Sequence, residues 1–116
     1  MLATSAGEPV VVDRQLRPDA TVLAVGAHSA DTRELHEDVL RGAQVIVEDV
    51  EAARREAGDA VIAVEKGALA REDVATMAEV VRGDVALDPA RRVVFKTVGM
   101  PWEGLTVAGA WGALVR

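Results

Sequence analysis

The sequence predicts an α/β fold in three layers, with a short, mostly parallel sheet flanked by helices. Apolar runs that are too short to be helices alternate with segments of helical spacing along most of the chain. These runs are continuous, as in strands that are buried on both faces. Helix-capping residues and glycines separate the segments. With 116 residues the chain has the size of one core, so we expect a single domain over residues 1–116.

Three short apolar runs are the expected strands. Each is bounded by polar residues or glycine, and each is too short for an ordinary helix. A fourth run, at residues 10–12, lies between Pro9 and Pro18, which makes it either an edge strand or an extended loop. The three strands are expected at residues 21–25, 45–47 and 93–95.

Four helices are expected around these strands. Asp31 followed by Glu34 matches a capping box, in which each side chain satisfies an orphan amide, and predicts a helix that ends at Gly42. Asp49 is expected to cap a second helix, which Gly58 ends in the same manner. The helices are expected at residues 31–42, 50–57, 71–82 and 101–114.

The last two helices have different terminal signals. The helix at residues 71–82 has acids in its first turn, where the helix dipole favours them, and Gly83 as its stop. The final helix begins at about Pro101. Its three glycines each weaken it by about 1 kcal/mol relative to alanine, so its order must come from packing. The residues expected to be buried in it are Leu105, Ala108 and Trp111.

Charge and composition exclude several classes of partner. The net charge is −6 and the arginines are scattered among acids, so we expect no nucleic-acid binding. No run approaches the roughly 18 apolar residues of a membrane span, and no basic residue precedes Arg14 as in a signal peptide. We therefore expect no membrane association and a cytoplasmic location. The chain has no cysteine, which leaves His, carboxylates, Lys and hydroxyls for chemistry.

Three stretches of the sequence are similar to one known family. Residues 3–10 contain Ala-Thr-Ser and then Glu-Pro-Val, residues 24–35 contain a strand that ends in glycine and then an Arg-Glu-Leu triplet, and residues 94–100 read Val-Phe-Lys-Thr-Val-Gly-Met. The chain thereby resembles the ornithine cyclodeaminase and mu-crystallin family, which includes cyclodeaminases, certain alanine dehydrogenases and ketimine or pyrroline carboxylate reductases. The resemblance spans essentially the whole chain but only the last third or so of a family member.

This resemblance implies a half-Rossmann unit, the second half of an NAD(P)-binding domain. In the family, the first strand of that domain carries the glycine-rich turn that holds the cofactor pyrophosphate. A separate N-terminal subdomain carries the substrate-carboxylate Arg and the catalytic Lys. No Gly-x-Gly-x-x-Gly or Gly-x-Gly-x-x-Ala occurs in the chain. We therefore expect binding of NAD or NADP by this chain alone to be weak or absent.

The resemblance also implies which residues approach the cofactor. Lys96, Thr97 and Val98 occupy the turn that lies beside the nicotinamide ring in relatives. Thr4 and Ser5 are expected on a neighbouring strand end that faces the same crevice. Hydroxyls and backbone amides suit the neutral carboxamide, although the same hydroxyls could simply cap backbone groups at strand ends. The expected cofactor-binding set is Thr4, Ser5, Gly26, Lys96, Thr97, Val98 and Gly99.

His28 is the candidate catalytic residue. It follows Gly26 at the carboxyl end of an expected parallel strand, where doubly wound folds bind ligands. Histidine can act as a general acid or base near neutral pH. The cyclodeaminases of the family carry an Asp at this place for proton transfer. The alternative is a solvated loop histidine with no role.

No metal site is expected near His36. Glu34 is assigned to the capping box, and Glu37 and Asp38 are consecutive residues that point in different directions around a helix. The acids at helical spacing are therefore interpreted as surface and capping residues.

Two functional hypotheses follow. In the first, the chain is a component or truncated form of an NAD(P)-dependent enzyme that acts on an amino or imino acid, and is active only when another chain supplies the dinucleotide loop and the substrate subdomain. In the second, it is a non-catalytic binding or assembly module, or the product of a truncated gene. In both, half a sheet leaves unpaired edges and uncovered apolar surfaces. This predicts a homo-oligomer or association with a complementing chain.

Overall fold

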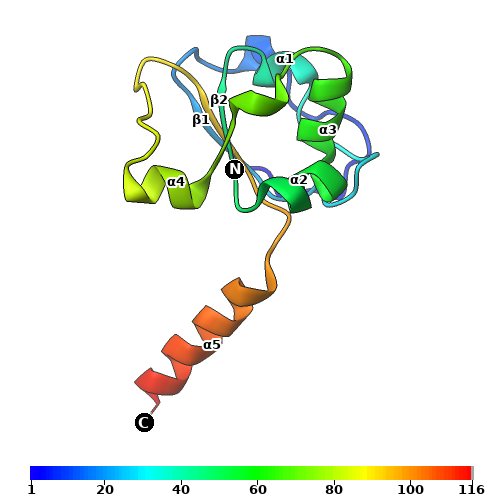
Figure 1. Ribbon diagram of the computed structural model, residues 1–116. Helices are drawn as coiled ribbons and strands as arrows, with labels where there is room; N and C mark the ends of the chain where they lie inside the picture. Colours follow the sequence, from blue (N-terminus) through cyan, green and yellow to red (C-terminus); the bar gives the residue numbers. More distant parts are fainter. Residues whose placement is uncertain (116) are drawn as a thin grey trace.

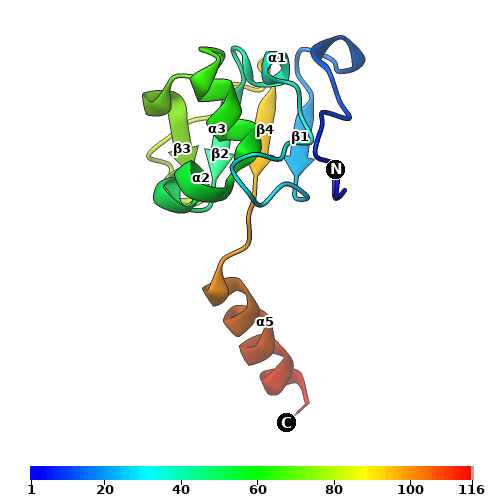
Figure 2. The same cartoon turned by 90° about the vertical axis from the view of Figure 1, so that its right-hand side faces the viewer.

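A four-stranded parallel sheet forms the centre of the molecule. The computed structural model describes residues 1–115, and its strands lie in the order β1-β4-β2-β3 with every pairing parallel. The predicted α/β class is confirmed, and each of the three expected strands is present within one residue at either end. The strands are β1 (Thr21–Ala24), β2 (Gln44–Val47), β3 (Val74–Thr76) and β4 (Val93–Lys96) (Figures 1 and 2).

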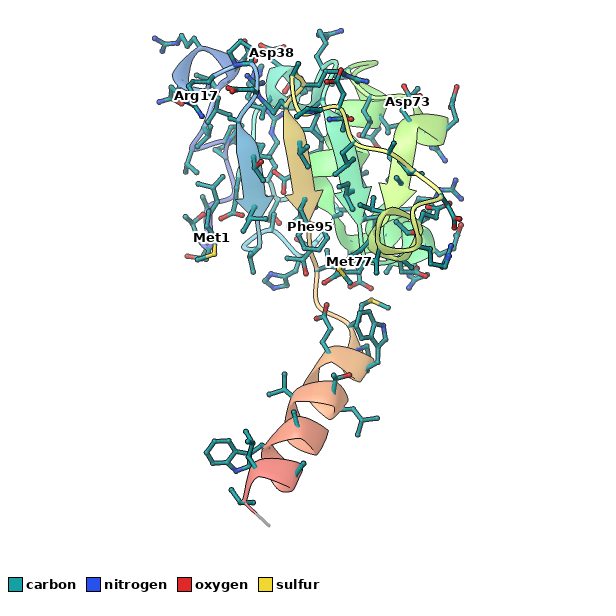
Figure 3. The ribbon with its side chains drawn as sticks, turned by 90° about the vertical axis from the view of Figure 1, so that its left-hand side faces the viewer. Met1, Arg17, Asp38, Asp73, Met77 and Phe95 are labelled. Carbon is teal, nitrogen blue, oxygen red and sulfur yellow. The ribbon has the colours of Figure 1, made fainter. Side chains whose placement is uncertain are left out.

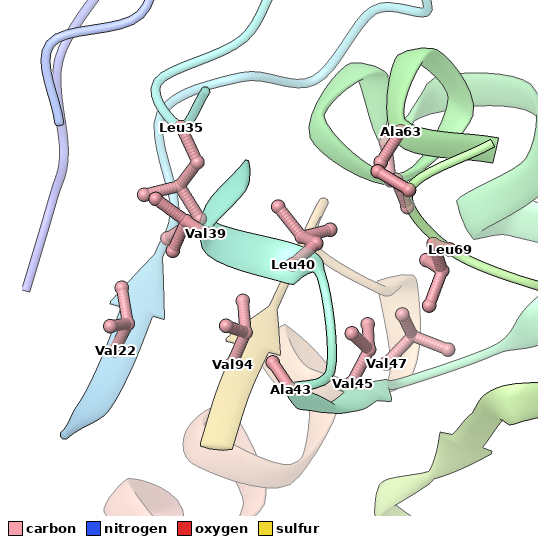
Figure 4. Packing of buried hydrophobic residues seen from close by; sticks show 14 of the residues in the cluster. Val22, Leu35, Val39, Leu40, Ala43, Val45, Val47, Ala63, Leu69 and Val94 are labelled. Atoms are coloured by element: carbon pink, nitrogen blue, oxygen red, sulfur yellow. The ribbon is translucent and has the colours of Figure 1, made fainter. Parts of the chain in front are cut away.

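Three helices cover one face of the sheet. They are α1 (Glu37–Leu40), α2 (Val50–Glu56) and α3 (Gly58–Glu65), which lie on the same side of the strands in Figure 2. Side chains alternate across each strand, so Val22 and Ala24 of β1 point under these helices and are buried. The main core lies in this layer, as Figure 4 shows. It includes Val22, Leu35, Val39, Leu40, Val45, Val47 and Val94.

The opposite face of the sheet is only partly covered. α4 (Met77–Arg82) and the segment at residues 84–92 lie on this side (Figures 1 and 3). Ile46 of β2 is accordingly 6% exposed, whereas Leu23 of β1 is 38% exposed. The third layer is therefore present beside β2 and β3, while β1 keeps apolar side chains in contact with solvent.

The helix expected after Asp31 is shorter than predicted. Only α1 is helical, with His36 as its N-cap, and the segment before it is irregular. The capping-box interpretation of Glu34 was wrong, because its carboxylate accepts backbone amides from distant strand ends instead. Long-range hydrogen bonds thus replaced the local cap. Gly42 does end α1 in the left-handed region, with φ 70°.

Gly58 was wrongly expected to end a helix. Asp49 caps α2 as predicted, since its side chain accepts the amide of Ala52 at 2.7 Å. Gly58, however, is the first residue of α3, a helix that was not predicted, and it is not among the glycines with positive φ. A Cβ at this position would overlap the carbonyl oxygen of Thr32. Glycine is required here for close approach of two segments and not for a turn.

The expected helix at residues 71–82 divides into three elements. A 3-10 helix covers Arg71–Asp73, β3 follows, and α4 begins after Thr76. Thr76 and Glu79 form the capping box of α4, and Gly83 ends it with φ 81°, as predicted. The helical prediction was wrong over β3 because pairing with β2 supplies ladder hydrogen bonds and cross-strand contacts, which outweigh a local helical pattern.

The segment at residues 10–12 is an extended loop, the second of the two alternatives. Val11 forms one isolated parallel bridge with Leu35. Arg92, which is 8% exposed, lies 2.5 Å from Asp13 and fixes the chain just beyond this segment. The segment is therefore ordered by a bridge and an ion pair, without becoming a strand.

α5 (Pro101–Leu114) has the predicted bounds but not the predicted burial. It projects away from the sheet (Figure 1), and none of its residues is buried. Leu105 is 75% exposed, Trp111 is 67% exposed, and Ala108 is exposed as well. The expectation of packing was wrong because no described element lies beside this helix. No helix within residues 1–115 is long and apolar enough to span a membrane. The cytoplasmic location stays a prediction.

Candidate functional site

The three stretches that carry the family resemblance meet at one edge of the sheet. Leu2 lies beside β1 through a parallel bridge to Ala24. Its amide donates to the carbonyl oxygen of Leu23 at 2.7 Å, and its carbonyl oxygen accepts the amide of Val25 at 2.9 Å. On the other side of β1, Thr97 donates its amide to Ala24 at 3.1 Å. Carboxyl ends of neighbouring parallel strands are where such sheets bind ligands. We call residues 3–5, 25–29 and 97–99 the strand-end edge.

Glu34 connects the end of β1 with the N-terminal segment that lies beside it. Its side chain is fully buried, and its two oxygens accept the amides of Thr4 and Gly26 at 2.6 and 2.7 Å. A Cβ on Gly26 would overlap both the carbonyl oxygen of Thr4 and the Glu34 carboxylate. Glycine is therefore needed at this strand end because the carboxylate and the neighbouring chain come so close.

Two more buried charges form a cluster with Glu34. Asp59, in the first turn of α3, accepts the amide of Glu34 and the next amide along the chain, both at 2.8 Å. The ammonium of Lys96 lies 3.5 Å from the other oxygen of Asp59. It also donates to the carbonyl oxygens of Ala24 and Thr97, at 3.2 and 3.0 Å. We call Glu34, Asp59 and Lys96 the buried triad.

Burial and hydrogen bonding shift the pKa of each member of the triad. Burial raises the pKa of Asp59 above 3.8 and lowers the pKa of Lys96 below 10.5; the attraction between the two groups opposes both shifts without cancelling them. Burial also acts to raise the pKa of Glu34, but the two amides that it accepts, together with Lys96, lower it overall. The carboxylate of Glu34 is thus held in its ionised form by its amide donors.

Glu48 fixes the turn that follows β4. This residue comes directly after β2, and its carboxylate accepts the hydroxyl of Thr97 and, at 3.0 Å, the amide of Val98. The amide of Gly99 donates to the Thr97 hydroxyl oxygen at 3.3 Å, and Gly99 has φ 81°. Two donors that the sequence analysis assigned to the nicotinamide are therefore engaged by Glu48, and the turn presents mainly oxygen acceptors.

The predicted residues on the rim are exposed. The Nδ1 atom of His28 lies 2.9 Å from the carbonyl oxygen of Gly26. A carbonyl can only accept, so Nδ1 carries a proton, and in the neutral ring Nε2 is then an acceptor. The hydroxyl of Thr4 accepts the amide of Ala6 at 3.2 Å, and Ser5 is exposed. These rim residues lie at the same edge as the turn after β4.

Lys96 lies differently from the other predicted site residues. Its side chain is 1% exposed and is directed at Asp59, below the helices of the covered face. Only its backbone borders the strand-end edge. The ammonium therefore supports this edge from the interior, and the edge itself contains no Lys or Arg.

The strand-end edge fits a neutral, planar amide better than a diphosphate. Around Gly99 no atom lies within 4 Å of the position that a Cβ would take, so the turn is open on this side. Glu48 supplies acceptor oxygens at this turn, and the polar side chains elsewhere on the edge are hydroxyls and the imidazole of His28. A diphosphate needs cations or free backbone amides at a helix start. The edge accordingly offers hydroxyls, an imidazole and acceptor oxygens, and residues 3–5, 25–29 and 97–99 contain no Lys or Arg.

Sequence reasoning missed the carboxylates that build this edge. Glu48 and Asp59 were not singled out, and Glu34 was given the wrong role. One signal was available for Glu48, because an acid directly after a buried parallel strand lies at the ligand-binding edge. Nothing comparable marks Asp59, whose partners are backbone amides far away in the sequence.

Comparisons with known proteins agree with this geometry. Residues 1–111 match the model of the ornithine cyclodeaminase/mu-crystallin family. Ketimine reductase mu-crystallin from Mus musculus is 35% identical over 105 residues, which are 90% of this chain and 32% of that protein. A probable ornithine cyclodeaminase from Bordetella pertussis Tohama I has a similar structure, with a TM-score of 0.83 at 35% identity over 92% of this chain and 35% of that one.

A further solved structure carries a cofactor. Delta(1)-pyrroline-2-carboxylate reductase from Thermococcus litoralis, in complex with NADH and L-proline, has a TM-score of 0.77 at 31% identity. The similarity covers 84% of this chain and 31% of that chain.

Together, the parallel sheet and its strand-end edge define an α/β chain whose strands end at one shared edge. The chain belongs to the ornithine cyclodeaminase/mu-crystallin family. It spans about a third of the length of the relatives that it matches.

Proposed function

We propose that this chain forms the nicotinamide end of the cofactor site in an NAD(P)-dependent enzyme that acts on amino or imino acids. The meeting of the three family stretches at the strand-end edge carries this proposal. The relative that was solved with NADH and L-proline supports it. When bound, the cofactor supplies hydride transfer. The residues of this chain hold and orient its nicotinamide end.

Each residue of the turn after β4 has a proposed part in holding the carboxamide. The hydroxyl of Thr97 and the carboxylate of Glu48 accept the carboxamide NH2 group. Gly99 has no side chain and leaves room for the ring. Val98 packs its side chain against the core and so fixes the turn, while Lys96 supports it from below.

The other strand ends complete the proposed site. Thr4 and Gly26 contribute backbone whose position the Glu34 carboxylate sets. Ser5 offers an exposed hydroxyl at the rim. His28 is proposed to exchange a proton with the substrate through Nε2, which is left as an acceptor once Nδ1 donates to the chain.

The rest of the active site must come from residues outside this chain. The chain has no glycine-rich dinucleotide turn, and it corresponds to 32% of a relative that is a complete enzyme by name. We propose that the dinucleotide turn and the substrate subdomain are supplied by further residues or by a complementing chain. Binding of NAD or NADP to residues 1–116 alone is accordingly weak, because the pyrophosphate contacts are missing.

A chimeric enzyme tests this function. Residues 1–111 replace the matching third of the Mus musculus ketimine reductase, and the product is checked for a cooperative thermal transition. The folded chimera is expected to bind NADH or NADPH and to reduce a cyclic ketimine. The parent enzyme is the positive control, and a chimera with Gly99→Val, which strains the turn at its φ of 81° and places a side chain on its open side, is the negative control. A folded chimera that binds neither cofactor would contradict the proposed function.

We also propose that the chain associates with a second copy or with a complementing chain. α5 is apolar and exposed along its length, and both tryptophans lie on it, Trp102 at 46% and Trp111 at 67% exposed. Leu23 and Val25 are exposed on the open side of the sheet, at 38% and 42%. Surfaces of this kind mark interaction sites in soluble proteins. The same surfaces favour the second candidate function, a non-catalytic assembly module.

Light scattering after size-exclusion chromatography measures this association. The expected mass is a multiple of 12.2 kDa, and a Leu105→Glu, Trp111→Glu double variant on α5 is expected to shift it to the monomer. Glu51→Lys on the exposed surface of α2 is the control and should leave the mass unchanged. A wild-type chain that remains a monomer at high concentration would count against association of identical copies.

A further inference from the structure

We propose that Glu34 is a positioning residue: its buried carboxylate sets the distance between the N-terminal segment at Thr4 and the strand end at Gly26, and its backbone amide is held by Asp59, the ion-pair partner of Lys96. The inference rests on the proposed function only in that these strand ends border the proposed cofactor site. The arrangement of the triad can be tested without any cofactor.

The two carboxylate oxygens of Glu34 each accept a backbone amide from a different segment. Its carboxylate meets the amide of Thr4 at 2.6 Å and the amide of Gly26 at 2.7 Å. Bonds to an ionised acceptor are shorter and stronger than those between neutral groups. The N-terminal segment is joined to β1 by the bridge of Leu2, and to the strand end at Gly26 by the hydrogen bonds of this carboxylate. Moving the carboxylate therefore moves both strand ends.

The other two charges hold the backbone from which the carboxylate of Glu34 extends. Asp59 binds the backbone amide of Glu34 itself, so that the residue is held at both its main chain and its side chain. Lys96 extends the cluster to β4 through the carbonyl oxygen of Thr97. One buried cluster thus touches all three stretches of the strand-end edge.

The composition of the triad argues against a role in stability alone. It places two carboxylates and one ammonium in the interior, with side chains at most 1% exposed. One oxygen of Asp59 has no hydrogen-bond partner within residues 1–115. Apolar side chains of similar size usually stabilise such a position as well or better. A Cβ on Gly26 would overlap the Glu34 carboxylate, so this carboxylate must lie in a narrowly defined position.

The test is a Glu34→Gln variant studied by NMR without cofactor. Glutamine keeps the shape but replaces one acceptor oxygen with an NH2 group, so at least one of the two amides loses its partner. We expect the amide proton of Thr4 or Gly26 to move upfield and to exchange about tenfold faster or more, since a hydrogen bond to a charged group is lost. The amides of Val45 and Val94 in the core should keep their exchange rates.

Glu37→Gln is the matched control, because Glu37 is a carboxylate close in sequence whose partners are Lys66 and Arg33 and not the amides of Thr4 and Gly26. It should leave the amides of Thr4 and Gly26 unchanged. If Glu34→Gln does not fold, Glu34→Asp keeps the charge and withdraws the carboxylate by one methylene, with the same local pattern expected. Faster exchange everywhere to an equal extent, or no change at the two amides, would overturn the positioning role.

NADH titrations of the same samples separate the two proposals. If the wild-type edge amides shift with NADH, Glu34→Gln should raise the dissociation constant about tenfold and Glu37→Gln should not. An unchanged constant in Glu34→Gln would overturn the positioning role. If the wild-type edge does not respond to NADH, the cofactor site is wrong for this chain, while the cofactor-free amide data still decide whether Glu34 positions the strand ends.

Discussion

Replacing Gly58 with alanine is expected to lower the free energy of unfolding by about 3 kcal/mol. The added Cβ would overlap the carbonyl oxygen of Thr32 and crowd that of Ser29. Both are backbone atoms, which cannot swing aside as a flexible side chain would. The φ angle of Gly58 is not positive, so alanine is acceptable in backbone terms and the loss comes from the overlap.

Thermal and urea unfolding of Gly58→Ala measure this effect, and the melting temperature should fall by more than about 10 °C. Gly112→Ala on α5 is the matched control, because no atom lies within 4 Å of its Cβ position. There alanine favours the helix by up to about 1 kcal/mol, so the melting temperature should stay the same or rise. Equal melting temperatures for Gly58→Ala and the wild type would show that the irregular segment before α1 does not pack against α3 as described.

Lys96→Met is expected to lower the free energy of unfolding by about 3–5 kcal/mol, the usual result of removing one partner from a buried ion pair. Methionine has a similar length, so the loss comes from charge and not from a cavity. Without the ammonium, Glu34 and Asp59 remain buried as two carboxylates, each less than 2% exposed. Lys66→Met is the control: Lys66 also pairs with a carboxylate, Glu37, at 2.9 Å, but its side chain is 48% exposed. The loss of that pair should cost about 1 kcal/mol, because Lys66 is partly exposed and Arg33 remains as a partner of Glu37.

The loss in Lys96→Met should depend on pH. Burial already raises the pKa of Asp59, and removing Lys96 removes an attraction that lowers it. An acid whose pKa is raised by folding stabilises the fold while it is protonated, and this contribution disappears as the pH rises through the folded pKa. The deficit of Lys96→Met relative to wild type should therefore be larger at neutral pH than at acidic pH. Urea unfolding at both pH values measures it, and an equal deficit at the two would contradict the expectation.

The sheet was more predictable than the helices. Continuous apolar runs identify β1, β2 and β4, because strands buried on both faces need no other signal. β3 was not predicted, because its three residues adjoin a capping box and a helical pattern. The irregular segment before α1 escaped because the amides and the carboxylate of Glu34 bond to distant strand ends. The Asp31 and Glu34 pattern predicts a local capping box, but Glu34 bonds to residues in other segments of the chain.

The candidate site divides in the same way. Thr97 and Gly99 were found through the family resemblance, and His28 because it follows a strand end; the meeting of these residues at one edge agrees with parallel topology. The sequence could not show that the Thr97 hydroxyl and the Val98 amide are already bonded, because their acceptor, Glu48, follows another strand. The burial of Lys96 could not be predicted either, because a lysine at a strand end is usually exposed. Its direction depends on Asp59, which α3 brings from another part of the chain.

Amide chemical-shift mapping with NADH is the most direct test of the cofactor site. Fluorescence is less suitable, because both tryptophans lie on α5 and would not report on individual residues of the strand-end edge. We expect shifts at Ser5, His28 and residues 97–99, with a dissociation constant in the millimolar range that reflects the missing pyrophosphate contacts. Shifts confined to α4 or α5, or no response at millimolar NADH, would contradict a nicotinamide site at this edge.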